Sequence, residues 1–333
     1  MEHFLQSISD IFWNTFMIIL IMELVIGNLG NGFLVLVNCM NWVKRKKISF
    51  INQILTALAT SRICMFLLLF KTLLIFSMYP DSIRTSGMTQ VLINSWMIVN
   101  HFSIWLATCL GVFYFLKIGN FSNFLFLYLK WRVKKAVSVV LLASLVLLFL
   151  NTLLINLEFN VCISEYQRNV SYSFASHYQA QCHRHVLILH TTFLFVPFGV
   201  CLSSFLLLIF SLWTHHKKMQ QHAQGSRDAR TTAHIKALKT VIAFLLLYTI
   251  FILSVLIQIW KYELTKKNLF ILFCQVVYIA FPSFHSCVLI LGDMKLRQAS
   301  LSLCCRAWKA GSKIWKSQNF RTLEIMLYIL GKD

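Results

Sequence analysis

Seven long apolar stretches constrain this sequence more than any other feature. A helix that spans a bilayer needs about 20 apolar residues, because every backbone polar group must be satisfied within about 30 Å of hydrocarbon. Seven stretches meet this test: residues 11–40, 51–78, 89–116, 136–157, 185–213, 237–260 and 269–291. The fourth and the seventh are the shortest. We predict an all-α membrane protein, a seven-transmembrane helix bundle. A hydrophobic content of 58% against 13% charged residues agrees, because a soluble chain of this length carries less apolar surface.

The first stretch is predicted to stay in the mature chain. Residues 1–10 include Glu2 and Asp10 and no Lys or Arg, so they lack the basic region of a secretory signal peptide. We therefore expect an extracellular N-terminus over residues 1–10, a seven-transmembrane domain over residues 11–291 and a cytoplasmic tail over residues 292–333.

Lys and Arg fall unevenly on the two sides of the predicted membrane. The links after the first, third and fifth spans and the tail carry 23 of them, and the other links carry 6. The richer side is expected to be cytosolic by the positive-inside rule, which predicts a multi-pass plasma-membrane protein. The net charge of +20 then faces anionic inner-leaflet lipid, which argues against a nucleic-acid partner.

Most of the ten cysteines lie in spans or in the tail. Only Cys162 and Cys182 fall in an oxidising compartment, and the sequence leaves open whether they form a disulfide. Cys304 and Cys305 follow the last span and are either palmitoylated or free thiols.

Two N-glycosylation sequons fall on opposite sides of the membrane. Asn169-Val170-Ser171 lies in the second outer loop, where we expect Asn169 to be glycosylated. Asn120-Phe121-Ser122 lies in a cytosolic loop and should stay bare.

Three charged residues lie inside spans, at a cost of roughly 2.5–3.5 kcal/mol each on insertion scales. We expect Glu23, Arg62 and Lys71 to face partners in the bundle interior. Asn31 shares its depth with Arg62. The two are predicted to form a polar cluster with the last span. This cluster either changes on activation or is a constant link between the helices.

The sequence shows few of the features expected of an enzyme or a transporter. It has no long soluble segment, no catalytic triad, no phosphate-binding Gly loop and no metal-ligand spacing, so neither a cofactor nor a metal is expected. His183 and His185 are read as solvated side chains. No internal repeat is evident, which disfavours transporters built from duplicated halves but leaves a transporter or channel as the rival of a different class.

A series of motifs runs from the second span to just past the last. In chain order they are Leu58-Ala59-Thr60-Ser61-Arg62-Ile63, Trp105-Leu106-Ala107-Thr108-Cys109-Leu110, Phe113-Tyr114-Phe115-Leu116-Lys117-Ile118, Phe126-Leu127-Tyr128-Leu129-Lys130-Trp131-Arg132, Ser211-Leu212-Trp213, His234-Ile235-Lys236-Ala237-Leu238-Lys239, Pro282-Ser283-Phe284-His285-Ser286 and Lys295-Leu296-Arg297-Gln298. This series resembles the type 2 taste receptors, the bitter receptors of vertebrates, and the resemblance as a whole runs from the first span to just past the last. A vomeronasal pheromone receptor, the nearest rival, lacks the His285-Ser286 and Phe-Leu-Lys-Ile matches.

The resemblance implies a G-protein-coupled receptor with a ligand pocket in the outer half of the bundle. It assigns to that pocket residues on the third, fifth, sixth and seventh spans: Trp96, Asn100, Phe193, Phe251 and Gln275. Trp96 and Asn100 lie one turn apart on one helix face. An aromatic wall with few polar groups suits small bitter amphiphiles. Some relatives carry an acidic group where this chain has Gln275, so we expect less preference for cationic ligands.

The resemblance also implies a cytosolic partner, a heterotrimeric G protein of gustducin or Gi type. It would bind a basic surface at the inner ends of the spans when the sixth span moves outward. The residues assigned to switching and coupling are Arg62, Tyr114, Lys117, His285 and Ser286.

Overall fold

The computed structural model describes most of the chain as helix and, within the described residues, contains no strand. It describes residues 2–45, 48–78, 86–168, 175–220, 229–260, 268–294, 296–303, 305–306 and 308–309. The helices are α1 (Glu2–Arg45), α2 (Phe50–Met78), α3 (Ser86–Ile118), α4 (Phe124–Trp131), α5 (Val133–Arg168), α6 (Ala175–Gln220), α7 (Ala229–Trp260) and α8 (Asn268–Gly292).

Every one of these helices except α4 is long and apolar enough to cross a membrane. In the described part of the chain there are seven such segments: Asp10–Lys44, Phe50–Ile75, Gln90–Ile118, Val133–Cys162, Arg184–Ser211, Ile242–Trp260 and Phe273–Gly292. The predicted seven-helix fold is confirmed, and the chain is a multi-pass membrane protein.

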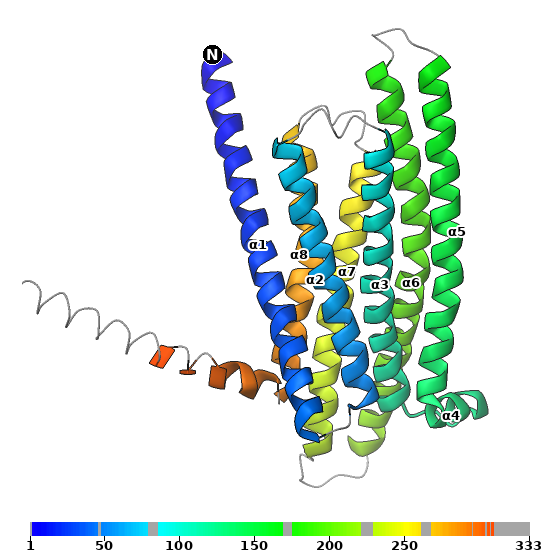
Figure 1. Ribbon diagram of the computed structural model, residues 1–333. Coiled ribbons are helices and arrows are strands. Elements are labelled where there is room, and N and C mark those ends of the chain that lie inside the picture. Colours follow the sequence, from blue (N-terminus) through cyan, green and yellow to red (C-terminus); the bar gives the residue numbers. More distant parts are fainter. Residues whose placement is uncertain are drawn as a thin grey trace, which may run out of the picture. The chain divides into compact units, whose positions relative to one another are not determined.

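Residues 1–289 form one compact unit. The spanning helices of this unit run side by side, and α4 crosses one end of the bundle beneath α3 and α5 (Figure 1). Helix α3 packs against α2, α5, α6 and α7. It is also the most buried span, with 61% of its apolar window inside the protein against 17% in α5. The core is therefore built around α3.

Some helix ends differ from the sequence prediction. The fourth span is not among the shortest, because the membrane segment of α5 has 30 residues and that of α2 has 26. Hydropathy detects only the apolar part of a helix, whereas α5 continues through polar residues to Arg168. Residues 2–10, predicted as an N-terminal segment ahead of the first span, belong to α1.

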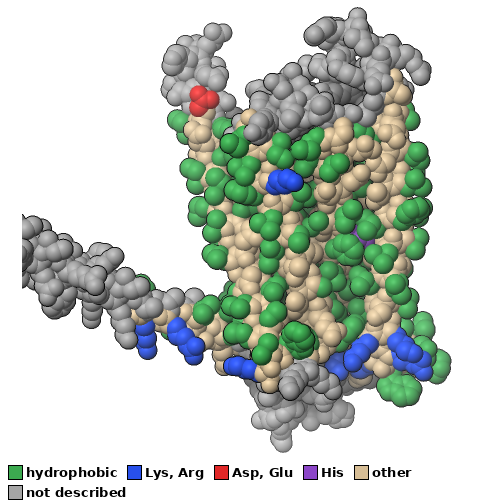
Figure 2. Space-filling view, viewed as in Figure 1, with side chains coloured by type: hydrophobic (Ala, Val, Ile, Leu, Met, Phe, Trp, Pro, Cys, Tyr) green, Lys and Arg blue, Asp and Glu red, His purple; other side chains and the backbone are tan. Residues whose placement is uncertain are grey.

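The outer surface of the bundle is apolar along its length. Figure 2 shows hydrophobic side chains over its side, with Lys and Arg gathered mainly at one end. Exposed tryptophans lie near both ends of the spans, with Trp13 and Trp260 at one level and Trp42 and Trp213 at the other. This is the distribution of aromatic residues expected at the two interfaces of a bilayer.

Lys71 corrects a prediction. The sequence argument placed it among the interior charges, but its side chain is exposed, in the half of α2 that ends at Met78. Lys71 lies seven residues from the helix end at Met78. From there a long, flexible side chain can extend its ammonium group to the interface while its methylenes stay in hydrocarbon.

The second compact unit comprises residues 290–333. Directly after the end of α8 at Gly292 comes a capped helical turn, in which the Asp293 carboxylate accepts a hydrogen bond from the backbone N–H of Leu296 at 3.2 Å. The Asp293 carbonyl accepts from the N–H of Arg297 at 2.9 Å. Cys305 is a free, exposed thiol.

Several residues of the sequence analysis cannot be compared, the side chain of His183 among them. Asn169 and Cys304 lie outside the described residues, and so does the side chain of Cys182. Cys162 is disulfide-bonded.

Candidate functional site

Arg62 is the central residue of a buried polar cluster that joins four helices. Its guanidinium has no exposed surface. Nη2 donates to Nδ1 of His285 at 2.6 Å, and Nη1 donates to the hydroxyl of Ser286 at 3.1 Å, both on α8. Nε donates to the hydroxyl of Ser103 on α3 at 3.4 Å. A buried cation needs such partners, because an unsatisfied donor in hydrocarbon is costly.

The contact with Arg62 determines the protonation of His285. A guanidinium has only donors, so Nδ1 of His285 must accept, and the ring hydrogen of the neutral imidazole lies on Nε2. Aromatic rings surround the pair: Phe244 of α7 lies 4.6 Å from the His285 ring between centroids. Phe281 lies 6.0 Å from the Arg62 guanidinium carbon. These rings keep the pair away from lipid.

Ser286 connects the cluster to α1. Its hydroxyl lies 2.8 Å from Oδ1 of Asn31 and 2.9 Å from the carbonyl of Pro282, so its single hydrogen is shared between two acceptors. Asn31 in turn donates to the carbonyl of Gly27 at 2.7 Å. One turn away, Ser283 donates to the backbone carbonyl of Glu23 at 3.1 Å. Helices α1 and α8 are thus tied by two adjacent polar contacts.

Glu23 lies on α1 at the contact with Ser283, one turn before Gly27. Its side chain is buried, as expected, and its Oε2 atom has no hydrogen-bond partner among the described residues. The sequence analysis expected a partner for this carboxyl group. The structure instead uses the Glu23 backbone carbonyl.

Gly27 allows α1 to approach its neighbours closely. A Cβ atom at this position would lie 2.5 Å from the ring of Phe66 on α2 and 2.9 Å from the hydroxyl of Ser283 on α8. Phe66 is almost fully buried, so its ring can shift only by displacing packed neighbours. The contact between α1, α2 and α8 therefore requires a glycine.

The two remaining residues assigned to switching occupy different environments. Tyr114 on α3 lines a small cavity, about 10 Å³ in volume, that His285 and Phe244 also line. Tyr114 is thus brought near the Arg62 cluster. Lys117 lies one turn further along α3 and is exposed. It belongs to the basic end of the bundle.

Trp96 and Phe251 are brought together by a residue that the sequence analysis did not single out. Tyr278 on α8 lies 5.7 Å from Trp96 and 4.6 Å from Phe251, between ring centroids. The three rings join α3, α7 and α8 in one aromatic wall. Tyr278 follows Gln275 by three residues, and this helical spacing could have indicated it.

Asn100 belongs to a second, polar part of the same region. Its amide nitrogen lies 3.4 Å from Nε2 of His190 on α6. Nδ1 of the same ring lies 3.3 Å from the amide nitrogen of Asn151 on α5. His190 therefore bridges two asparagines from different helices. A histidine in the middle of an apolar span was the sequence signal for it, and it was not used.

Two of the residues assigned to the ligand pocket, Phe193 and Gln275, are less closely grouped with the other assigned residues. Phe193 is half-buried and lies one turn after His190 on α6. Gln275 is exposed on α8, one turn before Tyr278. The assigned ligand set is therefore compact at Trp96 and Phe251 and looser at these two positions.

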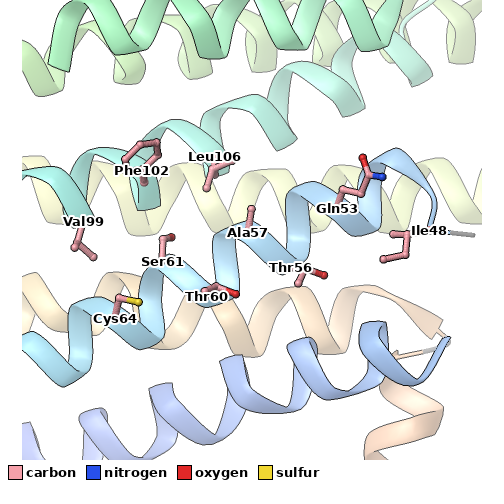
Figure 3. A pocket seen from close by; sticks show the side chains of 10 residues that line it. All are labelled: Ile48, Gln53, Thr56, Ala57, Thr60, Ser61, Cys64, Val99, Phe102 and Leu106. Carbon is pink, nitrogen blue, oxygen red and sulfur yellow. The ribbon is translucent and has the colours of Figure 1, made fainter. Parts of the chain in front are cut away.

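The larger described cavity lies elsewhere, as an open groove of about 610 Å³ along α2 and α3 (Figure 3). Its lining residues are Ile48, Gln53, Thr56, Ala57, Thr60, Ser61, Cys64, Val99, Phe102 and Leu106. Phe102 lies on a different face of α3 from Trp96 and Asn100, because a helix turns about 100° per residue, and Val99 lies at the border between the two faces. The groove contains none of the assigned ligand residues.

The region has the chemistry of a binding site. Aromatic rings supply apolar contact area, and Asn100 and His190 supply hydrogen-bonding groups. Among the described residues, no group of three or more His, Cys, Asp and Glu side chains could hold a metal ion.

Comparison with known proteins identifies the family. The family model of the taste receptor proteins (TAS2R) matches residues 9–308. The chain is 69% identical to taste receptor type 2 member 117 of Rattus norvegicus, over 91% of this chain and 95% of that protein. It is 65% identical to taste receptor type 2 member 117 of Mus musculus, over 97% and 98%. It is 52% identical to taste receptor type 2 member 14 of Macaca mulatta, over 86% and 90%. With the seven membrane-spanning helices, these matches show that the chain belongs to the TAS2R family of bitter taste receptors, which are G-protein-coupled receptors and not enzymes.

Proposed function

We propose that this receptor binds small bitter amphiphiles beside the aromatic wall of Trp96, Tyr278 and Phe251. The observation that carries the proposal is the position of this wall in the half of the bundle that also holds the Asn100–His190 pair. An apolar ligand face stacks on the rings, and a single polar group of the ligand hydrogen-bonds to the amide or the imidazole. Phe193 extends the apolar lining on α6.

Gln275 sets the preference for ligand charge in this proposal. It is a neutral residue at the edge of the site, so cationic ligands gain no ion pair there. Gln275→Glu should increase the potency of cationic bitter compounds and leave that of neutral ones unchanged. Equal changes in potency for cationic and neutral compounds would show that Gln275 does not contact the ligand.

We propose that ligand binding changes the packing around Arg62 and thereby opens the basic end of the bundle to a G protein of gustducin or Gi type. The proposal is supported by the number of helices that meet at Arg62, because a shift of any one must rearrange the hydrogen bonds of the others. His285 and Ser286 are the partners that would exchange. Tyr114 lies between this cluster and the basic end, to which Lys117 belongs.

The membrane orientation is part of the proposal. The N-terminus is extracellular and the tail cytoplasmic in the plasma membrane, on the argument from the uneven distribution of Lys and Arg. Asn169 then carries an N-linked glycan.

The function is tested by ligand-evoked calcium release in cells that express the receptor with a chimeric taste G protein. A panel of bitter compounds should give a response that is lost when the G protein is omitted. Trp96→Ala should abolish the response and Asn100→Ala should weaken it about tenfold, both with normal surface expression. A flux of the compound that does not depend on the G protein would instead indicate a transporter.

A further inference from the structure

The short helix α4 has an unusual composition for a connection at the end of a bundle. It links α3 to α5 and reads FLFLYLKW, so only one of its eight residues is charged. It is too short to span a membrane and crosses the end of the bundle beneath α3 and α5 (Figure 1).

One face of α4 is held firmly against the bundle. Phe126 is buried, and its ring centroid lies 5.4 Å from that of Phe115 and 5.0 Å from that of Phe121. The Lys130 ammonium donates to the carbonyl of Gly119 at 2.7 Å. A Cβ atom at Gly119 would lie 3.1 Å from the Phe126 ring, so the glycine permits this close approach. The helix therefore has a defined rotation about its axis.

The opposite face is apolar and exposed. Phe124 and Trp131 are 84% and 85% exposed, and Leu127 and Tyr128 are also exposed. At 100° per residue these four side chains fall on one continuous face, turned away from Phe126. An exposed apolar face of this kind on a membrane protein needs an apolar medium or partner. Trp and Tyr are the residues enriched where hydrocarbon meets headgroups.

Positive charge borders this face, in a stretch of the chain that has no acidic residue. Arg132, Lys134 and Lys135 follow α4 directly, and no Asp or Glu occurs from residue 117 to residue 157. All three basic side chains are exposed. The Arg132 guanidinium carbon lies 5.3 Å from the Tyr128 ring centroid, so a basic group and the aromatic face meet. Figure 2 shows Lys and Arg beside hydrophobic side chains at this end of the bundle.

We propose that α4 is an interfacial helix that binds anionic phospholipid. Phe124, Leu127 and Trp131 enter the boundary between acyl chains and headgroups, and Arg132, Lys134 and Lys135 contact the lipid phosphates. An amphipathic or apolar helix bordered by basic residues binds a membrane surface in two ways at once. Its apolar side chains are buried in the lipid, and its basic groups are attracted to anionic headgroups. The proposal goes beyond ligand recognition and G-protein coupling, and requires only that the loop lies at the membrane surface.

The test uses the full-length receptor in lipid nanodiscs and the fluorescence of Trp131. The Trp131 emission is the difference between the wild type and Trp131→Phe. We expect brominated phosphatidylserine to quench it about two-fold more than brominated phosphatidylcholine at the same mole fraction, because the charged headgroup is enriched at α4.

Two variants serve as controls. The triple variant Arg132→Gln, Lys134→Gln, Lys135→Gln should keep the quenching and lose the preference for phosphatidylserine. Trp13, an exposed tryptophan at the other end of the bundle beside Asp10, should be quenched without that preference. Its emission is obtained in the same way from Trp13→Phe.

Three results would overturn the proposal. The first is Trp131 emission that neither lipid quenches, which places the face in water. The second is equal quenching by both lipids in the wild type, which would show that α4 has no preference for the anionic headgroup. The third is Trp131 emission that changes only when a purified G-protein heterotrimer is added, which makes the face a protein docking surface. None of these readouts requires an agonist, so failure here is distinct from failure of the receptor assay.

Discussion

The Nη2 atom of Arg62 lies 2.6 Å from Nδ1 of His285, although the two residues are 223 positions apart in the chain. The pair is fully buried and lies between aromatic rings of α7 and α8. A buried cation with three hydrogen-bonding partners joins helices that have little other directional chemistry. The first predictions test how much the bundle depends on it.

Arg62→Ala should destabilise the folded receptor strongly. Removing one partner of a buried charge cluster costs about 3–5 kcal/mol, because His285 and Ser286 lose their donor and a cavity is left. Arg62→Lys keeps the charge but cannot reach three partners, and should cost about 1–3 kcal/mol. The measurement is thermal unfolding of the detergent-solubilised receptor. Lys71→Ala, on the exposed side of the same helix, should change stability by less than about 0.5 kcal/mol. An Arg62→Lys variant as stable as wild type would contradict the argument.

Asn31 and Ser286 should be energetically coupled across α1 and α8. Their side chains are 2.8 Å apart, so a double-mutant cycle of Asn31→Ala and Ser286→Ala should give an interaction energy of about 0.5–3 kcal/mol. Asn28 is the matched control, because among the described residues its amide bonds only to the Leu24 carbonyl of its own helix. The cycle of Asn28→Ala with Ser286→Ala should give a value near zero. Equal interaction energies in the two cycles would show that the Asn31–Ser286 contact is not a specific link between α1 and α8.

Gly27→Ala and Gly32→Ala should have opposite effects although both lie on α1. The new Cβ at Gly27 would meet the Phe66 ring at 2.5 Å, and overpacking of this kind costs about 1–3 kcal/mol. Gly32 has no atom within 4 Å of the added Cβ. Its replacement should therefore stabilise the helix, by up to about 1 kcal/mol. Thermal unfolding of the two variants side by side decides the matter. If Gly27→Ala unfolds at the same temperature as Gly32→Ala, α1 does not approach α2 and α8 as closely as described.

His190→Ala should weaken the response to bitter agonists to the same extent as Asn100→Ala. The two side chains share one contact, and the loss of one hydrogen-bonding group corresponds to about a tenfold loss of potency. The measurement is the agonist concentration for half-maximal calcium release at matched surface expression. Thr192→Ala serves as the control on the same helix, because Thr192 is exposed and, within the described part of the chain, bonds only to the Ile188 carbonyl of its own helix. An unchanged potency in His190→Ala would separate the polar pair from the ligand site.

Asn169→Gln should abolish an endoglycosidase-sensitive shift in apparent mass, and Asn120→Gln should have no effect on it. The reason is topological: only the Asn169 sequon is proposed to face the lumen during synthesis. Asn120 is exposed at the same end of the bundle as α4, so accessibility alone does not explain a difference between the two. A glycan on Asn120 would reverse the proposed orientation.

Much of the bundle could be predicted from the sequence because insertion into hydrocarbon depends on local composition. All seven spans were located within a few residues, since each is a continuous apolar run. The helix ends were less accurate at α5, where polar residues continue the helix outside the hydrocarbon. Helix α4 was anticipated only as part of the basic surface at the inner ends of the spans, because eight residues carry too little periodicity to define a helix and its ends.

The sequence by itself determined the seven-helix membrane fold, its basic end and, through its motifs, the receptor family. Only the tertiary structure decided which residues face each other: His285 and Ser103 beside Arg62, Tyr278 between Trp96 and Phe251, and Lys71 on the outside. The physical reason is that a helix apolar on all sides, such as α3, has little preferred rotation of its own. Its rotation is set by side-chain packing and by hydrogen bonds between helices, and both depend on neighbours far away in the chain.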